Sequence, residues 1–230
     1  SDIAVLYRSN AQSRVIEHQL FSTGIPYRVY GGLRFFERQE IKHALAYLRL
    51  LANSDDDTAF LRVVNFPTRG IGARSIEALA DSARTYNASL YAIVPHLGGR
   101  AGSSLAVFVR LIEDMRQATR DLPLPEVIDH VLDASGLRAH YRAEREGEER
   151  LANLDELLNA AANFIGEAED PSLAGFLAHA SLEAGEHQAD AGQDAVQMMS
   201  IHAAKGLEFN VVFLSGLEEG LCPHENALNE

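Results

Sequence analysis

The sequence has little of several features that would point to particular classes of protein. Among its 230 residues there is one cysteine, Cys222, and no tryptophan. A single cysteine cannot form an internal disulfide, so secreted disulfide-stabilised scaffolds are disfavoured and a reducing, cytoplasmic setting is expected. No apolar run approaches the 18 residues typical of a membrane span, and the first residues lack the features of a signal peptide. The composition, 47% hydrophobic, is sufficient for a globular core.

Positive charge is also scarce, and it is unevenly distributed. The net charge is −13, from 20 Lys or Arg and 33 Asp or Glu residues. Residues 1–80 nevertheless contain ten basic and eight acidic residues, whereas the only basic residue after Arg150 is Lys205. An acidic protein can bind nucleic acid when its cations share one face, although a solvated acidic surface is the simpler interpretation of the charge alone.

The first 52 residues have the pattern of a parallel α/β sheet. Residues 3–7 and 27–30 are short apolar or β-branched runs that predict strands, and residues 11–21 between them have apolar side chains at helical spacing. This strand–helix–strand order is the repeating unit of parallel sheets. A further amphipathic helix is predicted over residues 40–52.

From residue 53 to about residue 194 the pattern is almost entirely helical, and it returns to strands at residues 196–201 and 211–214. The sequence therefore predicts a partial α/β domain interrupted by a helical insertion, with parts at residues 1–52, 53–194 and 195–230. The predicted helices of the insertion cover residues 58–64, 74–86, 90–97, 105–121, 125–134, 150–167 and 173–182.

Four longer segments carry a resemblance to a known family. They are YRSNAQSR at residues 7–14, YGGLRFFERQEIK at 30–42, RGIG at 69–72, and SIHAAKGLEF at 200–209, which runs on into LEEGLCPH at 217–224. Together, and in this order, they resemble the superfamily 1 DNA helicases of the UvrD/PcrA/Rep type. Residues 182–186 and 193–197 look closer to the UvrD branch than to the others.

The resemblance implies a fold and an activity. Such helicases clamp ATP between two RecA-like motor domains, each with an inserted accessory domain. The chain would begin within the second motor domain (2A), contain its helical insertion (2B), and return for helicase motif V. The parent would be an ATP- and Mg²⁺-dependent helicase that moves 3′ to 5′ in repair or replication. No Gly-x₄-Gly-Lys-Ser/Thr phosphate loop occurs here, so this chain alone is expected to be inactive.

The motor segments contain the residues expected to bind single-stranded DNA and nucleotide. In parallel α/β sheets, ligands bind beyond the carboxyl ends of the strands, where several of these residues are expected. By resemblance, Lys205 lies near the ATP phosphates and Glu208 contacts the ribose, which suits an ammonium and a carboxylate. Also by resemblance, the single strand is contacted by Arg8, Asn10, Arg34, His202 and His224. Taken alone, a histidine and a lysine would more simply belong to an ordinary surface loop.

The insertion contains a candidate contact for duplex DNA. Arg69-Gly70-Ile71-Gly72 precedes a predicted helix and resembles the turn of a helix–hairpin–helix. Glycines allow a phosphate to approach the backbone, a helix N-terminus offers free N–H groups, and Arg69 and Arg74 add positive charge. A plain Gly-x-Gly loop is the alternative. Contacts of this kind would be independent of base sequence.

Two other functions are compatible with the sequence, and its candidate metal ligands are better explained in other ways. The helical block could instead be a regulatory module that binds partner proteins such as repair factors. Alternatively, the hairpin could belong to a DNA glycosylase with Glu77 or Asp81 as its acid. No metal site is predicted: Asp55–Asp57 fits a helix cap better than a calcium loop, and Cys222 with His224 lacks a second ligand pair for zinc. No membrane partner is expected.

Overall fold

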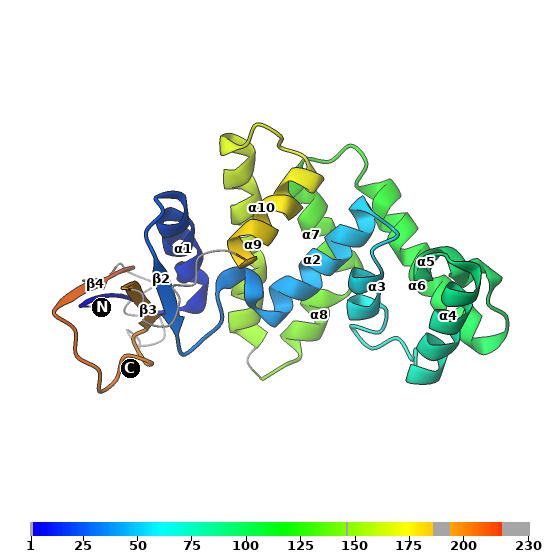
Figure 1. Ribbon diagram of the computed structural model, residues 1–230, viewed down its shortest axis with the longest axis horizontal. Helices are drawn as coiled ribbons and strands as arrows, with labels where there is room; N and C mark the ends of the chain where they lie inside the picture. Colours follow the sequence, from blue (N-terminus) through cyan, green and yellow to red (C-terminus); the bar gives the residue numbers. More distant parts are fainter. Residues whose placement is uncertain (1, 146, 186–193, 218–230) are drawn as a thin grey trace. The chain divides into compact units, whose positions relative to one another are not determined.

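The computed structural model describes residues 2–145, 147–185 and 194–217 (Figure 1). The chain forms two compact units. One comprises residues 1–38 and 179–230, and we call it the α/β unit. The other, residues 39–178, is the helical unit. Each is described by itself below.

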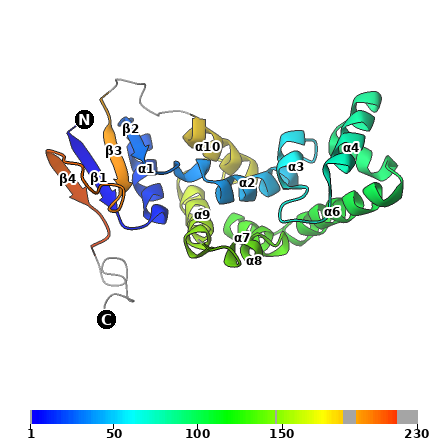
Figure 2. The same ribbon diagram turned by 90° about the horizontal axis from the view of Figure 1, so that it is seen from below.

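The α/β unit is built on a four-stranded parallel sheet (Figure 2). The strand order is β2-β3-β1-β4, so β3, which is distant in sequence, lies between the first two strands. The register pairs Ala4 with Gln197 and Tyr27 with Val196. The elements are β1 (Ile3–Tyr7), η1 (Asn10–Gln12), α1 (Ser13–Ser22), β2 (Tyr27–Tyr30), η2 (Phe35–Glu37), β3 (Val196–Ser200) and β4 (Val211–Leu214).

The core of the α/β unit is small. Tyr7, Tyr27 and Met198 are buried together, and Ile16 and Leu20 of α1 pack against them. All of the side chains of β4, by contrast, are exposed, with Phe213 at 58%. The sheet therefore buries apolar side chains around α1 and leaves its β4 edge open in the described residues.

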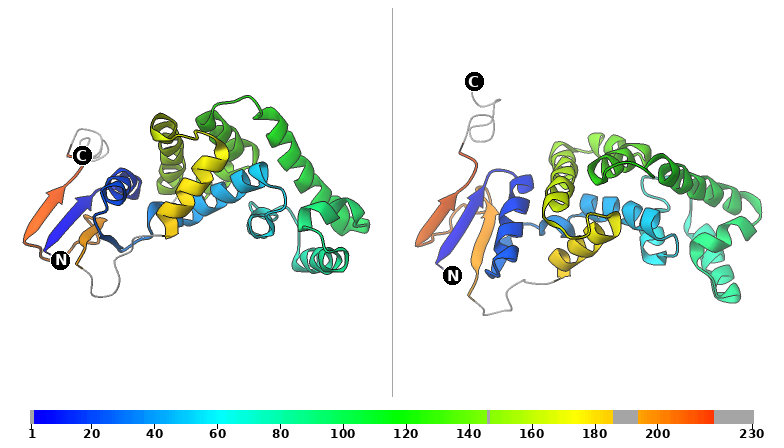
Figure 3. Two further views of the ribbon diagram at one scale, coloured as in Figure 1. Left: turned by 45° about the horizontal axis from the view of Figure 1, so that its top comes forward. Right: turned by 90° about the horizontal axis from the view of Figure 1, so that it is seen from above.

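The helical unit is organised around one helix, α2 (Gln39–Ala52), which packs against α3, α6, α7 and α9 (Figure 3). Ten of its fourteen residues are buried. Arg116 of α6 stabilises its carboxyl end by donating to the carbonyls of Leu50 and Leu51 at 2.8 and 3.2 Å. The other elements are α3 (Asp57–Val63), α4 (Ala73–Tyr86), α5 (Leu90–Ile93), η3 (Val94–His96), α6 (Gly99–Ala118), α7 (Leu124–Ala134), α8 (Leu137–Arg142), α9 (Gly147–Glu167) and α10 (Leu173–Gly185), which continues into the α/β unit.

The predicted fold class is confirmed: a parallel α/β sheet interrupted by a mostly helical segment. Two details differ from the sequence prediction. Helix α6 begins at Gly99 rather than at residue 105, and α8 was not predicted. The early turns of α6 contain Gly102, where a Cβ atom would lie 2.0 Å from the carbonyl oxygen of Leu97. A six-residue helix such as α8 shows too few turns for its periodicity to be recognised.

The compact units divide the chain at residues 38/39 and 178/179. The sequence prediction placed the divisions after residues 52 and 194, and so assigned α2 to the motor part. The difference arises because the apolar face of α2 packs against other helices of the insertion. Among the described residues, none of the helices combines the length and apolar character needed to span a bilayer.

Candidate functional sites

The carboxyl edge of the sheet brings together residues that are far apart in sequence. Because the strands are parallel, the segments after β1, β2 and β3 all leave the sheet at this edge. Arg8 follows β1 and His202 follows β3, and Arg8 Nη1 lies 3.4 Å from His202 Nδ1. Both side chains are exposed. A cation and an imidazole from segments nearly two hundred residues apart thus form one polar surface, which we call the edge surface.

The segments of the edge surface are held by short-range contacts. Gln12 Oε1 accepts hydrogen bonds from the backbone N–H groups of Arg8 and Ser9, at 2.9 and 3.0 Å. Gly31 has a φ of +74°, and a Cβ atom there would lie 2.9 Å from the Cβ of Ala203. The turn after β2 therefore approaches the turn after β3 to a distance that only glycine permits. A Cβ atom on Gly32 would lie 3.9 Å from Asn10 Oδ1, so Asn10 belongs to this surface too.

Arg34, also predicted to bind DNA, is occupied by contacts within the protein. Its side chain is buried, and its guanidinium donates to both carboxylate oxygens of Glu37 at 3.1 and 3.2 Å. It also donates to the backbone carbonyls of Glu183 and Ala184 in the last turn of α10. The hydrogen bond with Glu37, opposed by burial, raises the pKa of Arg34 above its ordinary value. These contacts give Arg34 a structural role as the residue that holds the carboxyl end of α10.

The two residues predicted to bind nucleotide lie in the segment after β3. Lys205 and Glu208 are both exposed. The segment begins as a tight turn in which the Ala204 N–H donates to the Ser200 carbonyl at 3.1 Å. The last residue predicted to contact single-stranded DNA, His224, lies outside the described residues.

The hairpin of the helical unit connects α3 to α4. Asn65 Oδ1 accepts hydrogen bonds from the backbone N–H groups of Arg69 and Ile71, at 2.9 and 3.1 Å. Gly70, between them, has a φ of +72°, which disfavours residues with a Cβ atom. Gly72 immediately precedes α4 and is exposed, with open space where a side chain would lie.

The two arginines of the hairpin differ in their surroundings. The guanidinium of Arg69 donates to the carbonyls of Val63, Pro67 and Ser135, at 3.3, 2.9 and 2.7 Å. It also lies over the rings of Tyr47 and Phe108, at 5.7 and 5.6 Å from their centroids. Arg74, one residue into α4, is exposed. Arg69 therefore stabilises the hairpin from inside, and Arg74 is the cation that the hairpin presents to solvent.

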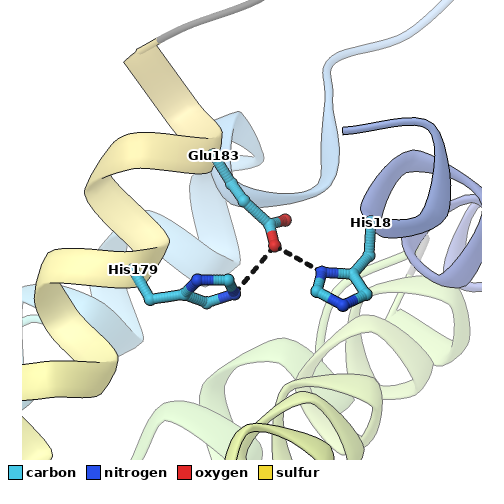
Figure 4. Close-up of side chains that lie close together, drawn as sticks. All are labelled: His18, His179 and Glu183. Atoms are coloured by element: carbon cyan, nitrogen blue, oxygen red, sulfur yellow. Dashed lines mark hydrogen bonds and ion pairs between the residues drawn. The ribbon is translucent and has the colours of Figure 1, made fainter. Parts of the chain in front are cut away.

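A third cluster, in the α/β unit, was not predicted from the sequence. Oε1 of Glu183 lies 2.7 Å from Nδ1 of His18 and 2.8 Å from Nε2 of His179 (Figure 4). The carboxylate is 7% exposed, and the two imidazoles are 15% and 27% exposed. Burial raises the pKa of Glu183, but hydrogen bonds from the two histidines outweigh it, so the net pKa is below the ordinary value. The spacing of His179 and Glu183 is visible in sequence; the approach of His18 is not.

The helical unit contains a separate buried histidine, His43. Its Nδ1 lies 2.7 Å from the hydroxyl of Tyr141, and its ring stacks on Phe66 at 3.8 Å between centroids. Burial is the main cause that lowers the pKa of His43 to about 4, with smaller contributions from nearby Arg62 and Arg150. His43 is therefore a neutral core residue at physiological pH.

These observations define a partial RecA-like α/β sheet with a helical insertion, and comparison with known proteins identifies the family. The model of the UvrD-like helicase C-terminal domain matches residues 1–230. The chain is 50% identical over 238 residues to DNA helicase II of Salmonella typhimurium and 50% identical over 241 residues to DNA helicase II of Escherichia coli K12. It is 43% identical over 243 residues to the ATP-dependent DNA helicase PcrA of Bacillus subtilis.

The chain therefore belongs to the UvrD-like helicase family, as the sequence motifs indicated. The three matches cover 99%, 100% and 100% of this chain but only 33%, 34% and 33% of the relatives. The chain thus spans about a third of the length of the curated relatives it matches. The glycosylase alternative loses its basis, since Glu77 and Asp81 are exposed on α4 in a chain that matches a helicase domain throughout.

Proposed function

We propose that this chain is the accessory-domain-bearing part of the second motor domain of an ATP-dependent DNA helicase that moves 3′ to 5′ in repair or replication. The observation that carries the proposal is the edge surface, where Arg8 and His202 meet beyond the carboxyl ends of β1 and β3. A motor must hold single-stranded DNA without reading its sequence, and contacts to phosphate and stacking surfaces provide such binding. Asn10 adds an uncharged hydrogen-bonding group to the same surface.

Lys205 and Glu208 would supply one wall of the ATP site. An exposed ammonium and carboxylate in one segment suit a phosphate and a ribose hydroxyl, respectively. Phosphoryl transfer also needs a phosphate loop and Mg²⁺ ligands, which in the parent would lie outside this segment. We expect no DNA-stimulated ATP turnover by the chain alone. Turnover above background that disappears in Lys205→Ala would contradict this assignment.

The hairpin would contact the duplex ahead of the motor. The backbone around Gly72, the start of α4 and the side chain of Arg74 are exposed together, as phosphate binding requires. The guanidinium of Arg69 also donates to three carbonyls, so Arg69 would support the hairpin as well as lie beside the duplex. Arg34 donates to carbonyls of α10, and its contact with single-stranded DNA stays a prediction.

A fluorescence anisotropy titration with single-stranded oligonucleotides tests the edge surface. Arg8→Ala and His202→Ala should each weaken binding at low salt, and Arg8→Ala should lower the salt slope by about 0.7 because one phosphate contact is lost. Arg110→Ala, which removes an exposed charge from α6, is the control. Equal effects of Arg8→Ala and Arg110→Ala would mean that Arg8 acts only through the overall charge of the chain and not through a contact at the edge surface.

A second titration, on two unrelated duplexes, tests the hairpin. Arg74→Ala should weaken both equally and lower the salt slope by about 0.9. Gly72→Val should weaken both more, because a side chain there keeps a phosphate from the backbone. Gly98→Val is a matched control, since Gly98 also precedes a helix, has extended backbone angles and has open space around it. Undiminished duplex binding in Arg74→Ala and Gly72→Val would favour a module that binds partner proteins.

A further inference from the structure

We propose that His18, His179 and Glu183 form a binding site for a divalent ion of the zinc class, independent of the DNA and nucleotide contacts. The three side chains come from the middle of α1 and from the last two turns of α10. One ligand atom from each lies within 4.8 Å of the other two. Figure 4 shows both imidazoles directed at the same carboxylate oxygen.

The spacing along the helices suits a shared ligand. His179 and Glu183 are four residues apart, so their side chains lie on one face of α10 about one turn apart. His18 approaches that face from α1, and the two imidazole rings meet edge to face with centroids 5.7 Å apart. In this arrangement, ring nitrogens rather than ring faces converge on the carboxylate.

The distances require only a small adjustment to admit an ion. Zinc is held at about 2.0 to 2.1 Å by histidine nitrogen and carboxylate oxygen in a tetrahedral arrangement, so ligand atoms are about 3.3 Å apart. The present nitrogen–oxygen distances are 2.7 and 2.8 Å. Side-chain rotations that widen them by about half an ångström would make room for the ion.

The donor set selects the kind of ion. Two imidazole nitrogens and one carboxylate oxygen suit Zn²⁺ and neighbouring transition ions, whereas Mg²⁺ and Ca²⁺ prefer oxygen ligands. Three protein ligands also leave a fourth position open to water. An ion bound here would therefore differ in its preferred ligands from the Mg²⁺ that accompanies ATP.

The surrounding charges are compatible with a dication. Glu17, a buried residue of α1, acts electrostatically on Glu183. The two cations next to this cluster are paired with other carboxylates, Arg38 with Glu17 and Arg34 with Glu37. The carboxylate of Glu183 would supply negative charge to the ion, and the two imidazoles would bind it as neutral ligands.

The competing interpretation is a hydrogen-bonded cluster without any ion, in which both imidazoles donate to Glu183. The chain also contains a histidine–glutamate pair with the same spacing that can serve as a control. His140 and Glu144 in the helical unit are also four residues apart, with Nε2 and Oε1 3.2 Å apart. That pair is not among the groups of three potential ligands found in the described residues. It should bind an ion weakly or not at all.

Ion binding would fasten the last turns of α10 to α1. Helix α10 belongs to the helical unit up to residue 178 and to the α/β unit from residue 179. An ion bound only in the folded state stabilises that state in proportion to the logarithm of its free concentration. The site would thus strengthen the point at which the chain re-enters the α/β unit.

The test is a titration of the untagged, EDTA-treated full chain with Zn²⁺ and, as a spectroscopic probe, Co²⁺. We expect one equivalent to bind, visible absorption typical of four-coordinate Co²⁺, a raised melting temperature for the α/β unit, and no comparable effect of Mg²⁺. His18→Gln and His179→Gln retain a hydrogen-bond donor but lose the imidazole ligand, and each should weaken binding at least tenfold. His140→Gln and Cys222→Ser should leave it unchanged.

Circular dichroism melts in EDTA check that the glutamine variants fold. If either variant fails to fold, Glu183→Gln is a further variant that lacks one of the three ligands. Binding that is equally strong in folded His18→Gln and His179→Gln, or that is lost in Cys222→Ser, would overturn the proposal. No bound equivalent of Zn²⁺ or Co²⁺ in the parent chain would do the same, and the cluster would then be a hydrogen-bonded contact only.

Discussion

The two units of this chain bury their apolar side chains in different ways. The helical unit surrounds α2, most of which is inaccessible to solvent, and all of the helices that pack against α2 come from one continuous stretch of chain, residues 39–178. The α/β unit joins strands from opposite ends of the chain and leaves the side chains of β4 exposed. The helical unit therefore has the properties of a self-contained domain, and the sheet depends on pairing between distant segments.

The candidate DNA contacts of the two units, the edge surface and the hairpin, also differ. On the edge surface, tertiary pairing brings Arg8 and His202 together, and both stay exposed. In the hairpin, Arg69 donates to two neighbouring carbonyls and to the distant carbonyl of Ser135, and Arg74 stays exposed. Residue type alone does not show whether an arginine is exposed or engaged with internal carbonyls; the folded structure does.

The largest expected effect concerns the independence of the helical unit. A chain of residues 39–178 should fold alone and melt cooperatively, because it contains the whole packing around α2. A chain of residues 53–178 lacks α2 and should show no cooperative melt. Circular dichroism on both distinguishes them. Cooperative melting of the shorter chain, or its absence in the longer one, would break the comparison between the units.

The next effect is a pH dependence of the helical unit. The pKa of His43 is lowered to about 4 by burial, below an unfolded value of about 6.5, so the unfolded state binds the proton first. Stability should therefore fall as the pH decreases from about 6.5 to about 4, by up to about 3 kcal/mol. The free energy of unfolding, measured with urea across this pH range, should depend less on pH for His43→Gln than for the parent. His96→Gln, at an exposed position, should behave like the parent.

A moderate effect should separate the two hairpin arginines. Arg69→Ala removes hydrogen bonds to the carbonyls of Pro67 and Ser135, and one of the hydrogen bonds to that of Val63, and should lower the free energy of unfolding by about 2 kcal/mol. Arg74→Ala changes an exposed side chain and should stay within about 0.5 kcal/mol of the parent. Urea unfolding of the helical unit measures both. Similar losses in the two variants would show that the hairpin does not depend on Arg69.

The smallest effect should distinguish two glycines of the α/β unit. Gly24 and Gly31 both have a positive φ, but only at Gly31 would a Cβ atom meet Ala203. Gly31→Ala should cost about 1 kcal/mol more than Gly24→Ala, because the turn must also move. It should weaken single-stranded DNA binding as well. Equal unfolding free energies and unchanged DNA affinity would mean that the turns after β2 and β3 adjust independently.

Much of the fold could be predicted from the sequence, because strands and long helices have a clear periodicity and the family motifs fix their order. The adjacency of Arg8 and His202 could also be anticipated, since parallel strands present their carboxyl ends at one edge. The internal contacts of Arg34 and Arg69 could not, because they involve carbonyls from α10 and from Ser135 that approach only in the folded chain. The same applies to His18, whose partners lie on α10.

The strand order has a consequence for how the chain folds. Strand β3 lies between β2 and β1, so Val5 must find Met198 before the sheet exists. Contacts between residues so distant in sequence form slowly, whereas helical contacts form quickly. We expect the helical unit to condense first during synthesis, shortening the effective loop that separates the strands. The sheet should then assemble faster than it would across an unfolded insertion. Ile3–Tyr7 remains unpaired until β3 has been synthesised.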